Sequence, residues 1–202
     1  MNIVLLEPLG IPEEALASLS APLTAAGHSF FACPLTHIDA ETVEQAKDAD
    51  VVLLANKRLG NDVIRALPRL KFISVAFTGV DHVGLEACGE RGIAVSNAAG
   101  YATDSVAELA VCMMISCLRN VHACDQRCRE GGTKDNLVGT TLRGKTVGIV
   151  GTGAIGLRVA KIAQAFGCKV LAYSRTQKDV EGVTYTDLNT LLSSCDIVSL
   201  HV

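Results

Sequence analysis

The chain has 202 residues, of which 49% are hydrophobic and 19% are charged, and its formal net charge is −3. This apolar content is enough to form a buried core, which excludes a wholly disordered chain. The slight negative charge favours neither nucleic acid nor an anionic membrane surface as a partner. We find no signal peptide and no apolar run that is long enough to span a membrane, so we expect a cytoplasmic protein.

Short β-rich runs alternate with helical stretches over the first hundred residues. The expected strands cover residues 3–6, 29–32, 51–55, 72–76 and 93–96, and the expected helices cover residues 13–25, 40–46, 61–67 and 84–91. This alternation predicts an α/β fold in which helices cover a parallel sheet.

A long apolar stretch follows, from residue 105 to about residue 129. Apolar side chains between Val106 and Leu118 occupy nearly every face of a helix, and such a helix must be buried on all sides. Ser105 and Glu108 have the spacing of a capping box at its start. In a chain of this length, burial on every side favours contact with a partner subunit.

The second half begins again as strand, helix and strand. Residues 131–136 are polar and glycine-containing, and they predict a loop. The expected elements that follow are a strand at residues 146–150, a helix at 154–166, a strand at 170–173, a helix at 187–192 and a strand at 196–200.

A glycine turn lies between the first strand and the first helix of this half. Gly151, Gly153 and Gly156 have the spacing GxGxxG. The first permits a tight turn, the second lets the backbone approach a pyrophosphate, and the third lets the helix pack against the strand. The helix start at Ala154 and Ile155 would offer free N–H groups to phosphates. Strand, turn and helix together favour a bound dinucleotide over a glycine turn that has no ligand.

The end of the next strand is where an acidic residue usually binds the ribose 2′-hydroxyl of NAD. Ser174 and Arg175 stand there instead. A hydroxyl and a planar cation suit a 2′-phosphate, which favours NADP(H) over NAD(H). The alternative is a solvated arginine after a strand, and Lys178 or Asp179 in the same loop would also influence the preference.

The eight cysteines are scattered and form no CxxC pair, so we expect reduced thiols. The best candidate metal ligands are His122, Cys124 and Cys128, of which the two cysteines would share a helix face. A metal site needs more ligands than these, so we expect no metal.

Five segments, in combination, resemble one family. They are residues 78–82, 96–99, 105–109, 146–156 and 196–201. Over essentially its whole length the chain is similar to the D-2-hydroxyacid dehydrogenases, which include phosphoglycerate dehydrogenases and glyoxylate/hydroxypyruvate reductases. The resemblance implies an oxidoreductase that transfers hydride between NAD(P)H and a 2-keto or 2-hydroxy acid.

The family fold implies two parallel-sheet domains. Residues 1–100 would form a flavodoxin-like substrate domain. Residues 101–202 would form a Rossmann dinucleotide-binding domain that is incomplete at its C-terminal end. The family dimerises through the segment that matches residues 105–129, so the resemblance also implies a homodimer.

The resemblance further implies a set of site residues. Phe77, Thr78, Gly79 and Val80 would present backbone N–H groups to the substrate carboxylate, and Thr78 would also reach toward the nicotinamide. The other expected cofactor-binding residues are Thr103, Gly151, Gly153, Ala154, Ile155, Gly156, Ser174, Arg175, His201 and Val202.

Three positions near these motifs need separate interpretation. Ala154 departs from the family, which often has a basic or longer polar residue there, but backbone contacts to phosphate would survive the change. Asp81 is explained as the cap of a helix, and Glu108 is better explained as a cap than as a site residue.

Three residues that the family's chemistry requires are not found in this chain. They are an arginine that binds the substrate, a histidine that acts as general acid/base and a glutamate that keeps this histidine protonated. His201 and His82 are poor replacements, because no orienting carboxylate is evident. We therefore expect a C-terminally truncated sequence without catalytic residues, inactive as 202 residues. The alternative function is a non-catalytic dinucleotide-binding or sensor module.

Overall fold

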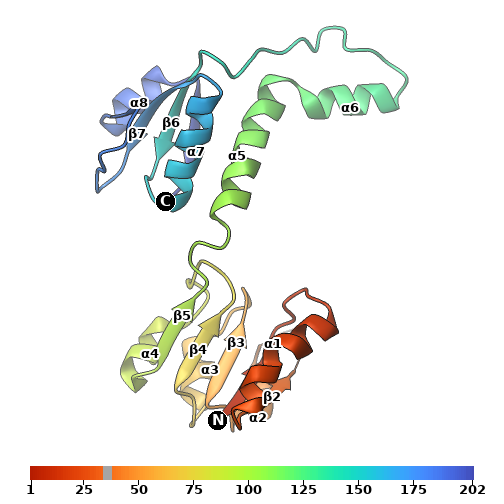
Figure 1. The fold of residues 1–202 in the computed structure, drawn as a ribbon, viewed down its shortest axis with the longest axis vertical. Helices are drawn as coiled ribbons and strands as arrows, with labels where there is room; N and C mark the ends of the chain where they lie inside the picture. Colours follow the sequence, from red (N-terminus) through yellow and green to blue (C-terminus); the bar gives the residue numbers. More distant parts are fainter. Residues whose placement is uncertain (34–37) are drawn as a thin grey trace. The chain divides into compact units, whose positions relative to one another are not determined.

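The computed structural model describes residues 1–33 and 38–202. The chain divides into two compact units, Met1–Tyr101 and Ala102–Val202 (Figure 1). Each unit contains its own parallel β-sheet, as the alternation of strands and helices predicts.

The first unit contains a five-stranded parallel sheet of order β2-β1-β3-β4-β5. Its strands are β1 (Asn2–Leu5), β2 (Ser29–Ala32), β3 (Val51–Leu54), β4 (Phe72–Val75) and β5 (Ala94–Asn97). Its helices are α1 (Glu13–Ala25), α2 (Ala40–Ala46), α3 (Asn61–Ala66) and α4 (Leu85–Arg91). This strand order is that of the flavodoxin-like doubly wound sheets, in which ligands bind beyond the carboxyl ends of the strands.

The core of the first unit forms where β3 and β4 meet the helices. Burial alternates along both strands, so Val52, Leu54 and Ile73 are fully buried, and Ile64 of α3 and Ala87 of α4 pack in the same cluster. Each fully buried Leu or Ile contributes about 2 kcal/mol to folding. The carboxyl ends of these two strands are therefore held rigidly.

Asp50 is a buried carboxylate at the amino end of β3. It accepts a hydrogen bond from the Asn2 N–H at 2.9 Å, and Lys71 Nζ lies 3.2 Å from its other oxygen. These two contacts lower the pKa of Asp50 from 3.8 to about 2. A carboxyl whose pKa is lowered by folding stabilises the folded state above its unfolded pKa, and this contribution is lost as the pH falls through the folded value.

We expect Asp50→Asn to lower the free energy of unfolding at neutral pH, because the variant cannot carry this charge. The difference from the wild type should shrink as the pH falls from about 4 to about 2. Urea unfolding across that range measures it, with Asp48→Asn as the control for an exposed acid two residues away. A difference between wild type and Asp50→Asn that does not vary with pH would contradict this explanation.

The second unit contains a four-stranded parallel sheet of order β8-β7-β6-β9. Its strands are β6 (Thr146–Val150), β7 (Lys169–Tyr173), β8 (Val183–Tyr185) and β9 (Ile197–Leu200). Its helices are α5 (Thr103–Leu118), α6 (Val121–Arg129), α7 (Ala154–Ala165) and α8 (Leu188–Ser194). Helix α5 packs against α7, and Val147, Ile149, Val159 and Ala163 are fully buried in the shared core. The sequence analysis does not predict the three-residue strand β8.

The apolar stretch of residues 105–129 forms two helices rather than one. Between α5 and α6, Asn120 has a φ of 52°, in the left-handed region that asparagine tolerates, and the two helices make an angle of 64°. The predicted capping box is wrong, because α5 already begins at Thr103 and the Ser105 hydroxyl donates to the Ala102 carbonyl at 3.1 Å. Of the described residues, only this bent pair has the length and composition of a membrane span; no single helix does.

Candidate functional site

The glycine turn begins directly after β6, and its first glycine has no room for a side chain. Gly151 has a φ of +96°, and a Cβ added there would lie 2.2 Å from the carbonyl oxygen of His201. Its N–H donates to the Tyr173 carbonyl at 2.8 Å. The turn is therefore fixed between the ends of β7 and β9, and only glycine fits.

The other two glycines of the turn have opposite surroundings. A Cβ on Gly156 would lie 2.0 Å from the Gly151 carbonyl oxygen, so the absence of a side chain lets α7 pack against the turn. A Cβ on Gly153 would meet nothing within 4 Å. Neither conformation nor packing within the described residues requires glycine at residue 153, and its missing side chain leaves room for a ligand to approach the backbone closely.

The start of α7 is suited to an anion. Helix α7 has 12 residues, its N-cap is Gly153, and no side chain caps it. No acidic residue lies in its first turn. The free N–H groups and the positive end of the helix dipole are thus left for a ligand, as in dinucleotide-binding folds.

A cavity of about 490 Å³ opens beside this turn. Its lining residues are Val150, Gly151, Thr152, Gly153, Tyr173, Ser174, Arg175, His201 and Val202. Six of these are among the expected cofactor-binding residues. Three were not expected: Val150 and Tyr173 are the last residues of β6 and β7, and Thr152 occupies a variable position of the glycine motif.

The remaining expected cofactor-binding residues do not line this cavity. Ala154, Ile155 and Gly156 form the first turn of α7, directly after the lining residue Gly153. Thr103 is the first residue of α5. Thr78 belongs to the first unit, and its role toward a cofactor stays a prediction.

His201 lines the cavity at the end of β9. Its Nε2 lies 2.9 Å from the Ser199 hydroxyl, and its backbone N–H donates to the Val150 carbonyl at 2.7 Å. Burial lowers the pKa of His201, which keeps the imidazole neutral at neutral pH. Among the described residues no carboxylate bonds to this ring, so the residue lacks the partner that a general acid/base needs.

The expected carboxylate-binding loop follows β4 in the first unit. Bonds from Ala98 N–H to the Phe77 carbonyl (3.0 Å) and from the Asn97 side chain to the Thr78 carbonyl (2.7 Å) hold its shape. Within the described part of the chain, the N–H groups of residues 78–80 have no hydrogen-bond acceptor. Such free amides can bind an anion.

The segment after this loop differs from the prediction. Helix α4 begins at Leu85, so Asp81 lies too early to cap it; Asn61 of α3 instead accepts a bond from the Ala87 N–H at 3.1 Å. His82 precedes the helix, and its Nε2 is buried without a partner among the residues that the structure describes. No carboxylate of a described residue bonds to this ring.

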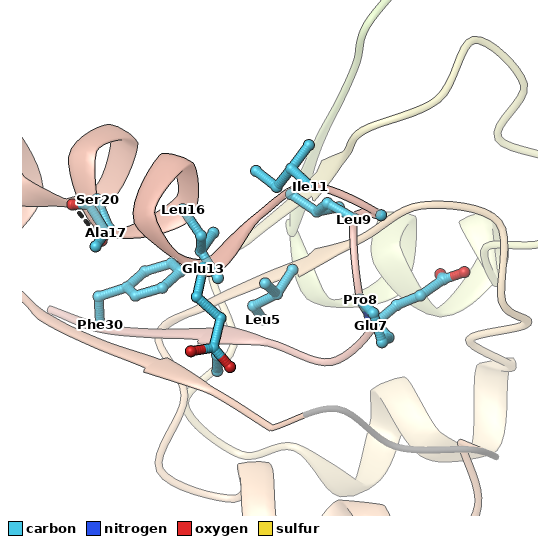
Figure 2. A pocket seen from close by; sticks show the side chains of 12 residues that line it. Leu5, Glu7, Pro8, Leu9, Ile11, Glu13, Leu16, Ala17, Ser20 and Phe30 are labelled. Carbon is cyan, nitrogen blue, oxygen red and sulfur yellow. Dashed lines mark hydrogen bonds between the residues drawn. The ribbon is translucent and has the colours of Figure 1, made fainter.

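A second cavity, of about 520 Å³, lies in the first unit between α1 and the strands β1 and β2 (Figure 2). Apolar side chains such as Leu5, Leu16 and Phe30 line it. Glu7 is also at its wall, but Figure 2 shows the carboxylate directed away from Leu16 and Phe30. That carboxylate accepts three backbone N–H groups of residues 55–57, each at 2.9 Å, and so fixes the loop after β3. The Glu7 carboxylate is therefore engaged in holding this loop, and the other polar side chains at the wall are Glu13 and Ser20.

We find no group of three side chains arranged to hold a metal ion within residues 1–33 and 38–202. All eight cysteines are free.

Comparison with known proteins agrees with this geometry. Residues 111–202 match the family described as D-isomer specific 2-hydroxyacid dehydrogenase, NAD binding domain. A D-lactate dehydrogenase (kk1H) of Curvularia clavata is 41% identical over 170 residues, which are 81% of this chain and 49% of that protein. The chain thus spans about half the length of this curated relative.

Solved structures extend the similarity to the entire chain. An NAD-dependent formate dehydrogenase of Staphylococcus aureus, in complex with NAD, has a TM-score of 0.89 and 28% identity, over 100% of this chain and 65% of that one. An acyclic imino acid reductase in complex with NADPH and D-Arg has a TM-score of 0.88 and 25% identity, with the same coverage. These likenesses, with the glycine turn and its cavity, support a site for a nicotinamide dinucleotide. Over residues 111–202, the second unit thus matches the NAD-binding domain of the D-isomer-specific 2-hydroxyacid dehydrogenase family.

Proposed function

We propose that the protein is an oxidoreductase that transfers hydride between a nicotinamide dinucleotide and a small 2-keto or 2-hydroxy acid. The observation that carries this proposal is the cavity at the glycine turn, where Gly153 is kept free of a side chain that the fold itself would admit. The nicotinamide, when bound, supplies or accepts the hydride. The chain's own residues bind and orient the two reactants.

Different residues around the cavity bind different parts of the cofactor. The N–H groups of Gly153, Ala154 and Ile155 bind the pyrophosphate, while Gly151 and Gly156 allow the turn that presents these groups. The strand-end residues His201 and Val202 form the wall toward the nicotinamide. Thr103 and, from the first unit, Thr78 complete the set that we assign to the cofactor.

Ser174 and Arg175 favour NADP(H) over NAD(H). Both line the cavity directly after β7, where an acid would repel a 2′-phosphate, and neither is acidic. Arg175 is exposed and forms no ion pair within the described part of the chain, so its charge is available to a ligand.

We expect Arg175→Ala to weaken NADPH binding by about tenfold, because one charge-assisted hydrogen bond to phosphate is lost, and to leave NADH binding unchanged. Calorimetric titration measures both. Lys169→Ala is the matched control, since Lys169 is an exposed cation at the opposite end of the same strand. Unchanged NADPH affinity in Arg175→Ala would remove the reason for preferring the phosphorylated cofactor.

The loop of Phe77, Thr78, Gly79 and Val80 binds the substrate carboxylate. Its free N–H groups support this role, since they lie at the carboxyl edge of a doubly wound sheet. The arginine, glutamate and histidine of the family's chemistry were not identified among these residues. We assign them to the part of the relatives' length that this chain does not span.

The activity itself is tested with the purified protein. It is expected to oxidise NADPH or NADH in the presence of glyoxylate, hydroxypyruvate or another 2-keto acid, followed by the loss of absorbance of the reduced nicotinamide. Cofactor binding without turnover across a panel of 2-keto acids would favour the alternative, a dinucleotide-binding or sensor module. The relatives' names as dehydrogenases and reductases favour the enzyme.

A homodimer through α5 and α6 is the expected assembly. The second unit buries Ala107, Val111 and Met114 of α5 but leaves Leu109 and Met113 59% and 58% exposed. Exposed apolar side chains of this size along one helix are typical of an interface, and a second copy of the helix supplies a matching surface.

We expect Leu109→Glu to raise the dimer dissociation constant by about 100-fold, because a charge would be buried without a partner. Light scattering during gel filtration measures the assembly. Leu19→Glu, on α1, changes a side chain that is 69% exposed and is the matched control. A Leu109→Glu protein that dimerises like the wild type would exclude this interface.

The proposed location is the cytosol. Eight free thiols are typical of a reducing compartment, in which disulfides do not persist.

A further inference from the structure

The loop that carries Ser174 and Arg175 is joined to the glycine turn by two hydroxyl groups. We infer that Tyr185 and Thr152 are positioning residues that fix this loop and so set how the site discriminates between 2′-phosphorylated and unphosphorylated dinucleotides. The inference rests on the proposed cofactor site. Thr152 occupies a variable position of the glycine motif, and Tyr185 belongs to no motif of the sequence analysis.

Four polar groups form a continuous chain of hydrogen bonds, which we call the hydroxyl relay. The Lys178 N–H donates to the Tyr185 hydroxyl at 3.2 Å, and this hydroxyl donates to Thr152 Oγ1 at 3.0 Å. Thr152 Oγ1 in turn donates to the Thr176 carbonyl at 3.5 Å. The relay thus begins and ends on the backbone of the same loop and passes through the glycine turn.

Each hydroxyl of the relay donates once and accepts once, so the direction of the chain is fixed. Hydrogen bonds arranged head to tail polarise and strengthen one another in a region of low dielectric constant. Thr152 is 2% exposed between Gly151 and Gly153, so its own two bonds are shielded from water, whereas the bond from Lys178 is exposed. The loss of either hydroxyl would leave the other polar groups unsatisfied.

The pairing of β8 with β7 places the Tyr185 hydroxyl within hydrogen-bond distance of Thr152. Tyr185 is the last residue of β8 and lies opposite Ala172 of β7, and the Thr186 N–H donates to the Ala172 carbonyl at 2.9 Å. The phenol ring is therefore carried by the sheet, while the loop of residues 174–178 that it holds has no strand of its own. The short strand β8 thus positions the Tyr185 hydroxyl as well as extending the sheet.

The hydroxyl relay also fixes the positions of Ser174 and Arg175, the two residues that precede it. Ser174 and Arg175 line the cavity and are followed at once by Thr176, whose carbonyl is the last acceptor of the relay. A loop held at residues 176 and 178 keeps the hydroxyl and the guanidinium of its first two residues beside the turn. A released loop would lose contacts to the 2′-phosphate but not contacts of the glycine turn to the pyrophosphate.

The test compares NADPH and NADH dissociation constants for Tyr185→Phe and Thr152→Val. Each removes one hydroxyl and keeps the shape of the side chain. Each is expected to reduce the NADPH-to-NADH affinity ratio by about three- to tenfold, and the double variant to reduce it no further than the stronger single one. Thr152→Ser should restore the ratio. Thr184→Val, which removes an exposed hydroxyl from β8 outside the relay, should leave it unchanged.

The possible results test the role of the hydroxyl relay separately from the preference for NADP(H). A wild-type protein that binds NADPH no more tightly than NADH would refute the NADP(H) preference, and the relay would then be judged by whether Tyr185→Phe changes the ratio. An unchanged ratio in both Tyr185→Phe and Thr152→Val would overturn the relay, even if Arg175→Ala changes it. Equal losses of NADPH and NADH affinity would also overturn it, since these indicate general damage to the site.

Discussion

Gly153→Ala is expected to fold like the wild type and to lose cofactor affinity by at least about tenfold. The backbone at residue 153 has a φ of −69°, which alanine adopts freely, and the position of the new Cβ is open to 4 Å. Since the methyl group would meet no described residue, we expect it to clash with a pyrophosphate that approaches the turn. The expected pattern is therefore a defect in binding without a defect in folding.

The control for this substitution is Gly89→Ala on α4. Among the described residues, Gly89 also has nothing within 4 Å of an added Cβ, but it lies in the other unit and not in the glycine turn. Thermal melting and calorimetric titration with NADPH and NADH measure the two effects. Wild-type affinity in Gly153→Ala would mean that the pyrophosphate does not approach this residue.

Gly156→Ala is expected to have the opposite effect, a loss of roughly 3 kcal/mol in the free energy of unfolding. Its Cβ would lie 2.0 Å from the Gly151 carbonyl oxygen and 3.2 Å from the Ile149 side chain. The closer neighbour is backbone at a tight turn and cannot move aside without shifting α7 against β6. Burial of the adjacent Val159 and Ala160 leaves little room for that shift.

Urea unfolding measures this loss, and Gly153→Ala is its matched control, three residues earlier on the same turn. A Gly156→Ala protein as stable as the wild type would contradict the close packing of α7 on the turn. The two substitutions together separate the glycine that serves the fold from the glycine that serves the ligand.

The sequence alone predicts most of the architecture and the main anchor of the site. Gly151, Gly153 and Gly156 are identifiable because each has a local reason that follows from its spacing. The helix expected at residues 187–192 is α8, which begins one residue later because Asp187 caps it by accepting bonds from the backbone and the hydroxyl of Thr190.

The errors arise where tertiary contacts outweigh local patterns. Ser105 and Glu108 have capping-box spacing, but such spacing also occurs inside a helix, and the helix begins earlier. Asp81 was assigned as a cap, whereas Asn61 of the neighbouring helix α3 satisfies α4. The Asn61 contact joins residues 26 positions apart and depends on tertiary structure, whereas Ser105 is excluded as a cap by the start of α5 at Thr103.

The hydroxyl relay could not be derived from spacing either. Thr152 and Tyr185 are 33 positions apart, and β8 has only three residues, too few for a periodic pattern. Their contact depends on the register between β7 and β8, which places Tyr185 beside Ala172. The one indication in the sequence is Thr152 itself, a polar residue between two glycines of a tight turn. Such a side chain needs a hydrogen-bond partner when the turn buries it.

The central claim is that the second unit binds a nicotinamide dinucleotide at the glycine turn. The most direct measurement is a titration of the ¹⁵N-labelled chain with NADPH, followed by amide chemical-shift changes. The largest changes are expected at Gly151–Gly156, at Ser174 and Arg175, and at His201. An absence of shifts, or shifts confined to the cavity beside α1, would contradict the assignment of the site.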